Sequence, residues 1–190
     1  MRSAPIHQTY TKEEIDELLE ENKRLKREVG FLRAHPTLAK GIRGETIFAT
    51  LLRATRATRG APHDLVTLGG ELRLEVKYSS LLRTYSTREG RRWVWTKLFG
   101  EMGNKNFDRL LLIGDLDPHF RESYIDPGSP YVIFDVSYQD ALELADGAQP
   151  GRKSRLHLTT NPRTVTSWRS RALFESFQVP TSELLARYEI

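Results

Sequence analysis

Asp64, Glu75 and Lys77 are the residues whose types and spacing point to chemistry. Residues 72–78 alternate apolar and polar side chains, which predicts a strand that projects Glu75 and Lys77 from one face, roughly 6.5–7 Å apart along its length. Asp64 begins a second predicted strand, over residues 64–68, and a Gly-Gly pair joins the two strands as a hairpin. We expect this hairpin to bring the Asp64 carboxylate close to that of Glu75.

Two carboxylates that converge in this way can hold a divalent cation, with the backbone carbonyl of Val76 as a further oxygen ligand. The sequence has no cysteine, which excludes a thiolate metal site, a thiol nucleophile and a disulfide framework. An all-oxygen site favours a hard ion, so we expect Mg²⁺, with Mn²⁺ able to replace it. The Lys77 ammonium would then lie where a water molecule or a phosphate group binds.

The elements that must position these residues form a series of helices and strands. Residues 41–58 are predicted to form a helix that carries Glu45. Further strands are expected at residues 92–98, 109–114, 131–136 and 155–159, and further helices from residue 137 or 138 to about 147, at 166–178 and at 181–188. This order predicts an α/β or α+β fold with one central mixed sheet flanked by helices.

Three acidic or charged features follow one another along the sequence. Glu45 lies on the first predicted core helix, Asp64 begins a strand, and the next strand holds the E-x-K tripeptide Glu75-Val76-Lys77. Over residues 41–145, this pattern resembles the PD-(D/E)xK nuclease superfamily, which has the restriction-endonuclease fold. His63 stands where the motif has proline. That position varies in the superfamily and carries no chemistry.

The resemblance implies specific roles for these residues. Asp64 and Glu75 would ligate Mg²⁺. Lys77 would orient or deprotonate the attacking water, or stabilise the charge that develops on the phosphate. Glu45 would assist the metal site.

Charge is unevenly distributed along the 190 residues, although the net charge is only +4. Residues 41–110 hold 13 basic and 7 acidic side chains, whereas residues 111–150 hold 1 and 8. A basic block is typical of a nucleic-acid-binding surface, and it also occurs on ordinary solvated surfaces. With the resemblance, it favours double-stranded DNA as the partner.

The proposed DNA contacts lie mainly on an Arg-rich ribbon at about residues 81–107, where Arg forks can read guanine edges. The candidates are Arg83, Arg88, Arg91, Arg92, Lys97 and Lys105, with a second basic group of Arg152, Lys153 and Arg155. Trp93 and Trp95 share one face of this ribbon, and we expect them to pack in the core rather than to stack on bases. Each charged residue is alternatively a solvated surface residue.

Residues 12–33 have the pattern of a coiled-coil helix, and Thr11 with Glu14 forms a capping box at its start. Heptad positions a and d are occupied by Ile15, Leu18, Asn22, Leu25, Val29 and Leu32. β-Branched residues at a, Leu at d and one Asn at a favour a parallel homodimer. The alternative is a single amphipathic helix that packs on its own domain. We therefore divide the chain into a dimerisation helix over residues 1–36 and a nuclease domain over residues 37–190.

The beginning of the sequence lacks the apolar stretch of a signal peptide, and its longest aliphatic run, residues 110–113, is too short to span a membrane. We expect a cytoplasmic protein without membrane contacts. The function that fits best is a Mg²⁺-dependent, dimeric type II restriction endonuclease of a restriction-modification system. A structure-specific nuclease such as a Holliday junction resolvase, and a non-catalytic coiled-coil DNA-binding protein, are the alternatives.

Overall fold

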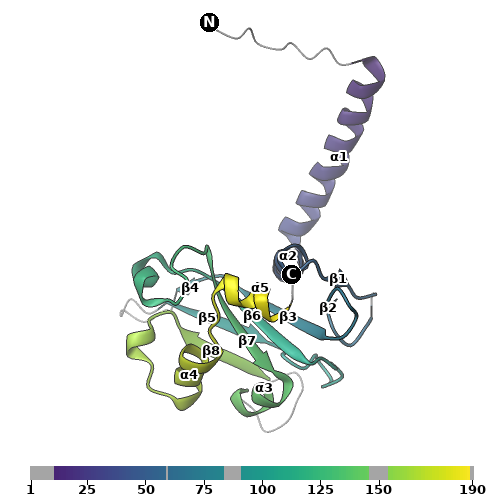
Figure 1. Cartoon of the computed structure of the whole chain (residues 1–190). Helices are drawn as coiled ribbons and strands as arrows, with labels where there is room; N and C mark the ends of the chain where they lie inside the picture. Colours follow the sequence, from purple (N-terminus) through teal and green to yellow (C-terminus); the bar gives the residue numbers. More distant parts are fainter. Residues whose placement is uncertain (1–10, 59, 84–90, 146–153, 189–190) are drawn as a thin grey trace, which may run out of the picture. The chain divides into compact units, whose positions relative to one another are not determined.

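The computed structural model describes residues 11–58, 60–83, 91–145 and 154–188. The chain forms two compact units, Met1–Ala39 and Lys40–Ile190. Figure 1 shows the helices and strands of each unit along the sequence. No helix among the described residues is long and apolar enough to cross a membrane.

Helix α1 spans Lys12–Ala34, in agreement with the sequence. The expected capping box is present: the Glu14 amide donates to the Thr11 hydroxyl at 3.2 Å, and the Thr11 amide donates to the Glu14 carboxylate at 2.7 Å. His35 caps the end of the helix, and α2 (Pro36–Leu51) begins at the next residue. Proline fits this position because the first amide of a helix needs no intrahelical partner.

The expected helix over residues 41–58 is wrong at both ends, because α2 runs over Pro36–Leu51. Arg53 adopts a positive φ of 45°, which turns the backbone out of the helix. Strand β1 (Thr55–Arg56) follows and pairs with β2 (Leu65–Val66). The predicted helix therefore included Thr55 and Arg56, which belong to the edge strand β1 of a sheet.

The main sheet has five strands in the order β1-β2-β3-β6-β7. Its longer strands are β3 (Arg73–Ser79), β6 (Arg109–Asp115) and β7 (Tyr131–Ser137). Strands β3 and β6 are parallel, and every other neighbouring pair is antiparallel. The predicted central mixed sheet and its predicted strands 109–114 and 131–136 are thus confirmed.

A second sheet was not expected. Strands β4 (Leu82–Arg83), β5 (Arg91–Thr96) and β8 (Arg155–Thr159) form a separate antiparallel sheet in the order β4-β5-β8. Strand β8 lies about 60 residues beyond β5 in the sequence, and the alternation within each strand does not reveal its partner. Residues 82–83 and 91–96 of the proposed ribbon are therefore built into a sheet.

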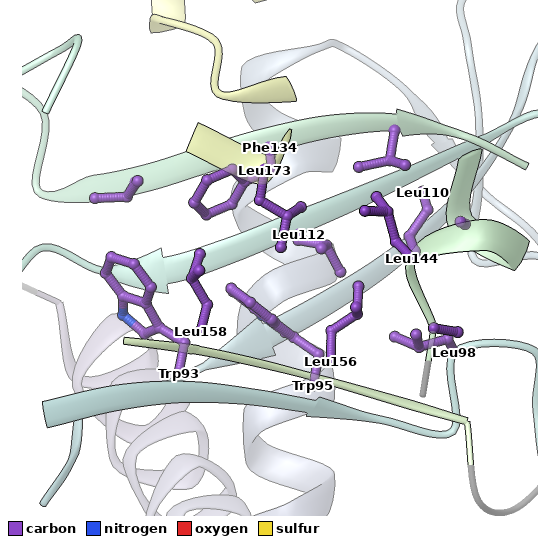
Figure 2. Close-up of a cluster of buried hydrophobic side chains, with 14 of the residues drawn as sticks. Trp93, Trp95, Leu98, Leu110, Leu112, Phe134, Leu144, Leu156, Leu158 and Leu173 are labelled. Atoms are coloured by element: carbon purple, nitrogen blue, oxygen red, sulfur yellow. The ribbon is translucent and has the colours of Figure 1, made fainter. Parts of the chain in front are cut away.

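Two hydrophobic clusters pack against opposite faces of the main sheet. Leu110 and Leu112 of β6 join one cluster, and the intervening Leu111 joins the other, as the alternation of a strand requires. Figure 2 shows the first cluster between the two sheets, where Trp93 and Trp95 lie among leucines of β6 and β8. Both indoles are at most 1% exposed, which confirms the expectation that they belong to the core.

Helices and short helical turns complete the second unit. They are 3₁₀ turns η1 (Pro118–Ser123) and η2 (Pro162–Thr164), helices α3 (Tyr138–Leu144), α4 (Trp168–Ala172) and α5 (Thr181–Arg187), and a π-helical turn η3 (Leu173–Phe177). Phe48 of α2 and Leu184 of α5 are both completely buried in the second cluster. These helices therefore cover the face of the main sheet that is opposite the second sheet.

Candidate functional site

The β2–β3 hairpin sets the position of Asp64. Leu65 pairs with Leu74, which places Asp64 opposite Glu75. The Asp64 amide donates to the Leu74 carbonyl at 3.0 Å, and its carboxylate Oδ2 accepts from the Val76 amide at 2.9 Å. The predicted convergence of the two acidic residues is therefore present.

The alternation of β3 separates its apolar side chains from its charged ones. Leu74 and Val76 pack in the second hydrophobic cluster, so Glu75 and Lys77 project to the opposite face. Glu75 is completely buried, and the Lys77 ammonium donates to its Oε1. Burial raises the pKa of Glu75, and the charge of Lys77 opposes this rise.

Lys105 completes this charge cluster. Its Nζ lies 2.8 Å from Asp64 Oδ1 and 2.8 Å from Glu75 Oε2. Burial works to lower the pKa of Lys105, but the charge of Glu75 and the hydrogen bond to Asp64 outweigh it, so this pKa is raised. Lys105 is one of the predicted DNA contacts, but in the structure its ammonium lies between the two carboxylates.

A loop of the chain delivers Lys105 to this position. Phe99 and Phe107, which flank Lys105 in the sequence, are buried and stack on each other with their ring centroids 6.0 Å apart. The Lys105 amide donates to the Phe99 carbonyl at 3.2 Å. The Asn106 amide donates to the Pro62 carbonyl at 2.8 Å, which ties the loop to the residues just before Asp64. No local sequence signal connects Lys105 with residues 30 to 41 positions earlier.

Glu45 is half-buried on α2 near the same cluster. Gly44 allows this approach, because a Cβ added there would lie 2.9 Å from Tyr78 Cβ and 3.2 Å from Val76 Cγ1, both on β3. Burial, followed by the charge of Asp64, raises the pKa of Glu45. The Glu45 carboxyl is therefore electrostatically linked to Asp64, Lys77 and Lys105.

The donor set suits a hard cation in its chemistry. Asp64 and Glu75 each present a carboxylate oxygen to the Lys105 ammonium, and Glu75 is completely buried. Within the described ranges, no three Asp, Glu or His side chains gather closely enough to hold a metal ion. Glu45 therefore does not complete a three-carboxylate set, and a bound ion would need ligands beyond Asp64 and Glu75, such as the predicted Val76 carbonyl.

Several proposed DNA contacts have partners within the protein. Arg91 contacts buried Asp117 at 3.1 Å, and Lys97 forms an ion pair with Glu101. Arg92 and Arg155 are exposed on β5 and β8. The Arg83 side chain, Arg88, Arg152 and Lys153 lie outside the described residues.

Comparison with known proteins identifies no family. No family model and no curated protein matches the chain. Among solved structures, a bacterial homing endonuclease is similar with a TM-score of 0.42 and 14% sequence identity, over 79% of this chain and 91% of that one.

Proposed function

We propose that this protein is a Mg²⁺-dependent endonuclease that cleaves double-stranded DNA. The observation that carries the proposal is the meeting of Asp64, which directly precedes β2, with Glu75 on β3, and Lys77 lies on the same face of β3. Hydrolysis of a phosphodiester needs a positioned water and stabilisation of the negative charge that develops on the phosphate. This cluster offers oxygen ligands for a cation and an ammonium group at adjacent positions.

In this proposal, Asp64 and Glu75 hold the divalent ion, which lowers the pKa of a bound water and neutralises phosphate charge. The hydrogen bond from the Val76 amide fixes the orientation of the Asp64 carboxylate before any ion binds. Lys77 is held by Glu75, and its ammonium group would stabilise the phosphate in the transition state. Glu45 supports the charge balance of the cluster from α2.

The outer face of the second sheet is the proposed DNA-binding surface. Trp93 and Trp95 of β5 face the core, so Arg92 faces outward, and Arg155 on the neighbouring β8 is exposed as well. Residues 41–110 as a whole carry the excess of basic side chains. Arg contacts to base edges would provide sequence specificity, whereas contacts to phosphates would raise affinity for any sequence.

Cleavage of both strands calls for two active sites, and α1 supplies a means of pairing them. The seam residues Ile15, Leu18, Leu25 and Val29 are all about half exposed in the chain. A second copy of α1 would cover them, with Asn22 selecting a parallel register. The proposed assembly is thus a homodimer, and its two-fold symmetry predicts a palindromic recognition site, as in a type II restriction endonuclease.

Plasmid cleavage in Mg²⁺ tests the proposal. Asp64→Ala and Glu75→Ala should abolish cleavage and leave DNA binding largely intact, because these groups hold the cation. Glu143→Ala removes an exposed carboxylate from α3 and should cut like the wild type. Wild-type cleavage by Glu75→Ala, or full activity in excess EDTA, would refute the site.

The form of the products separates the possible functions. Discrete fragments from plasmid DNA are expected for a restriction endonuclease. Selective cutting of four-way junctions would indicate a resolvase instead. A mobility shift without any cleavage would indicate a non-catalytic DNA-binding protein.

A further inference from the structure

The Lys105 ammonium lies where the proposed divalent ion would have to bind. Its Nζ is 2.8 Å from Asp64 Oδ1 and 2.8 Å from Glu75 Oε2, so these two oxygens lie within twice that distance of each other. A Mg²⁺ ion bonds oxygen at about 2.0–2.1 Å. An ion bound to both oxygens would leave no room for an ammonium group that contacts the same two atoms, and the two positive charges would repel each other.

The position of Lys105 is built into the fold. The Phe99–Phe107 stack fixes both ends of its loop, and Asn106 is hydrogen-bonded to Pro62 beside the site. The Lys105 side chain is 21% exposed, whereas the Lys97 side chain earlier in the same segment is 53% exposed. The fold therefore positions Lys105 at the two carboxylates. Its long, flexible side chain allows the ammonium to leave while the loop stays in place.

We propose that Lys105 is a resident counter-ion, which neutralises Asp64 and Glu75 in the metal-free protein and is displaced when the divalent ion binds. The inference rests on the proposed function, since it assigns a role at the same site. The physical need is clear, because Glu75 is completely buried and faces a second carboxylate. Lys77 already pairs with Oε1 of Glu75, so without Lys105 the two carboxylates would keep one uncompensated negative charge in a poorly solvated place.

The first test measures Mn²⁺ binding by titration calorimetry in the absence of DNA. In Lys105→Met the side chain keeps most of its length and loses its charge, so Mn²⁺ no longer competes with a tethered ammonium. We expect the dissociation constant to fall by about tenfold or more, within the usual range of couplings between two ligands. Lys97→Met is the matched control, because it removes an exposed lysine paired with Glu101, and it should bind Mn²⁺ like the wild type.

The second test uses the wild-type chain and therefore does not depend on the folding of a variant. Acetic anhydride acetylates free amines, and mass spectrometry gives the rate at each lysine. Saturating Ca²⁺ should raise the acetylation rate of Lys105 several-fold, because the displaced amine is exposed and the two carboxylates no longer hold its proton. The rate at Lys97 should stay unchanged. An unchanged rate at Lys105 under Ca²⁺ that has bound would overturn the inference.

The outcomes separate the inference from the function on which it rests. If the wild type binds Mn²⁺ and Lys105→Met binds it equally or more weakly, Lys105 is not a competitor, and the proposed function stands. If neither protein binds Mn²⁺, the metal site itself is refuted and both proposals fail. Tighter binding by Lys105→Met supports the displacement of Lys105.

Discussion

Leu25→Ala should weaken the proposed dimer because Leu25 occupies a d position of the α1 seam. Its side chain is 47% exposed in the chain, and full burial of a leucine stabilises by about 1.5–3 kcal/mol. Covering the exposed half therefore contributes about 1 kcal/mol in each copy. Loss from both copies removes about 2 kcal/mol, which raises the dissociation constant roughly 30-fold.

Leu19→Ala provides the matched control. Leu19 lies on the same helix and is 53% exposed, but it occupies an e position beside the seam. The two variants lose the same atoms and the same helix propensity, so they differ mainly in their place in the heptad. We expect Leu19→Ala to change the dissociation constant only a few-fold.

Sedimentation equilibrium over a range of protein concentrations measures both dissociation constants. In the same samples, the ratio of nicked to linear plasmid should rise for Leu25→Ala, because a monomer cuts one strand at a time. Asn22→Leu should tighten association and loosen the preference for two chains. Equal effects of Leu19→Ala and Leu25→Ala, or no effect of either, would show that the seam does not join two copies.

Three further changes test the site and its scaffold. Lys77→Ala should abolish cleavage while DNA binding in a mobility-shift assay stays near the wild-type level. Arg73 holds the Asp108 carboxylate by hydrogen bonds and lowers its pKa. Stability from this pair is therefore lost as the pH falls below about 4, and Asp108→Asn should flatten that acid limb in urea titrations. Gly114→Ala should lower the free energy of unfolding by roughly 1–3 kcal/mol, because the new Cβ would lie 2.5–2.7 Å from the buried Trp93 ring.

Local patterns were sufficient to predict the carboxylate pair. The alternation over residues 72–78 and the glycine turn specify a hairpin, and a hairpin determines which residues face each other across it. Asp64 and Glu75 are eleven positions apart and meet through this short-range geometry alone. The buried strands β6 and β7 were equally predictable, because their continuous apolar runs suit a strand covered on both faces.

Lys105 and the second sheet could not be predicted from the sequence for a different reason. Both depend on contacts between segments that are far apart in the sequence. The basic side chain of Lys105 is typical of a DNA contact. The packing of Phe99 on Phe107 and the hydrogen bond from Asn106 to Pro62 turn its loop toward the carboxylates. The alternation of buried and outward-facing side chains in β5 can be predicted from β5 alone. Its pairing with β8 depends on both strands.

The core fixes the geometry of the candidate site through the register of β3. Leu74 and Val76 pack beneath α2, and this places Glu75 on the face that Asp64 shares. A slip of one residue would turn both apolar side chains out of the core, at about 1.5–3 kcal/mol each, and would turn charged side chains into it. The hydrophobic packing therefore opposes any change in the register of β3. In the proposed exchange of counter-ions, the hydrophobic side of β3 would therefore hold the two carboxylates in place.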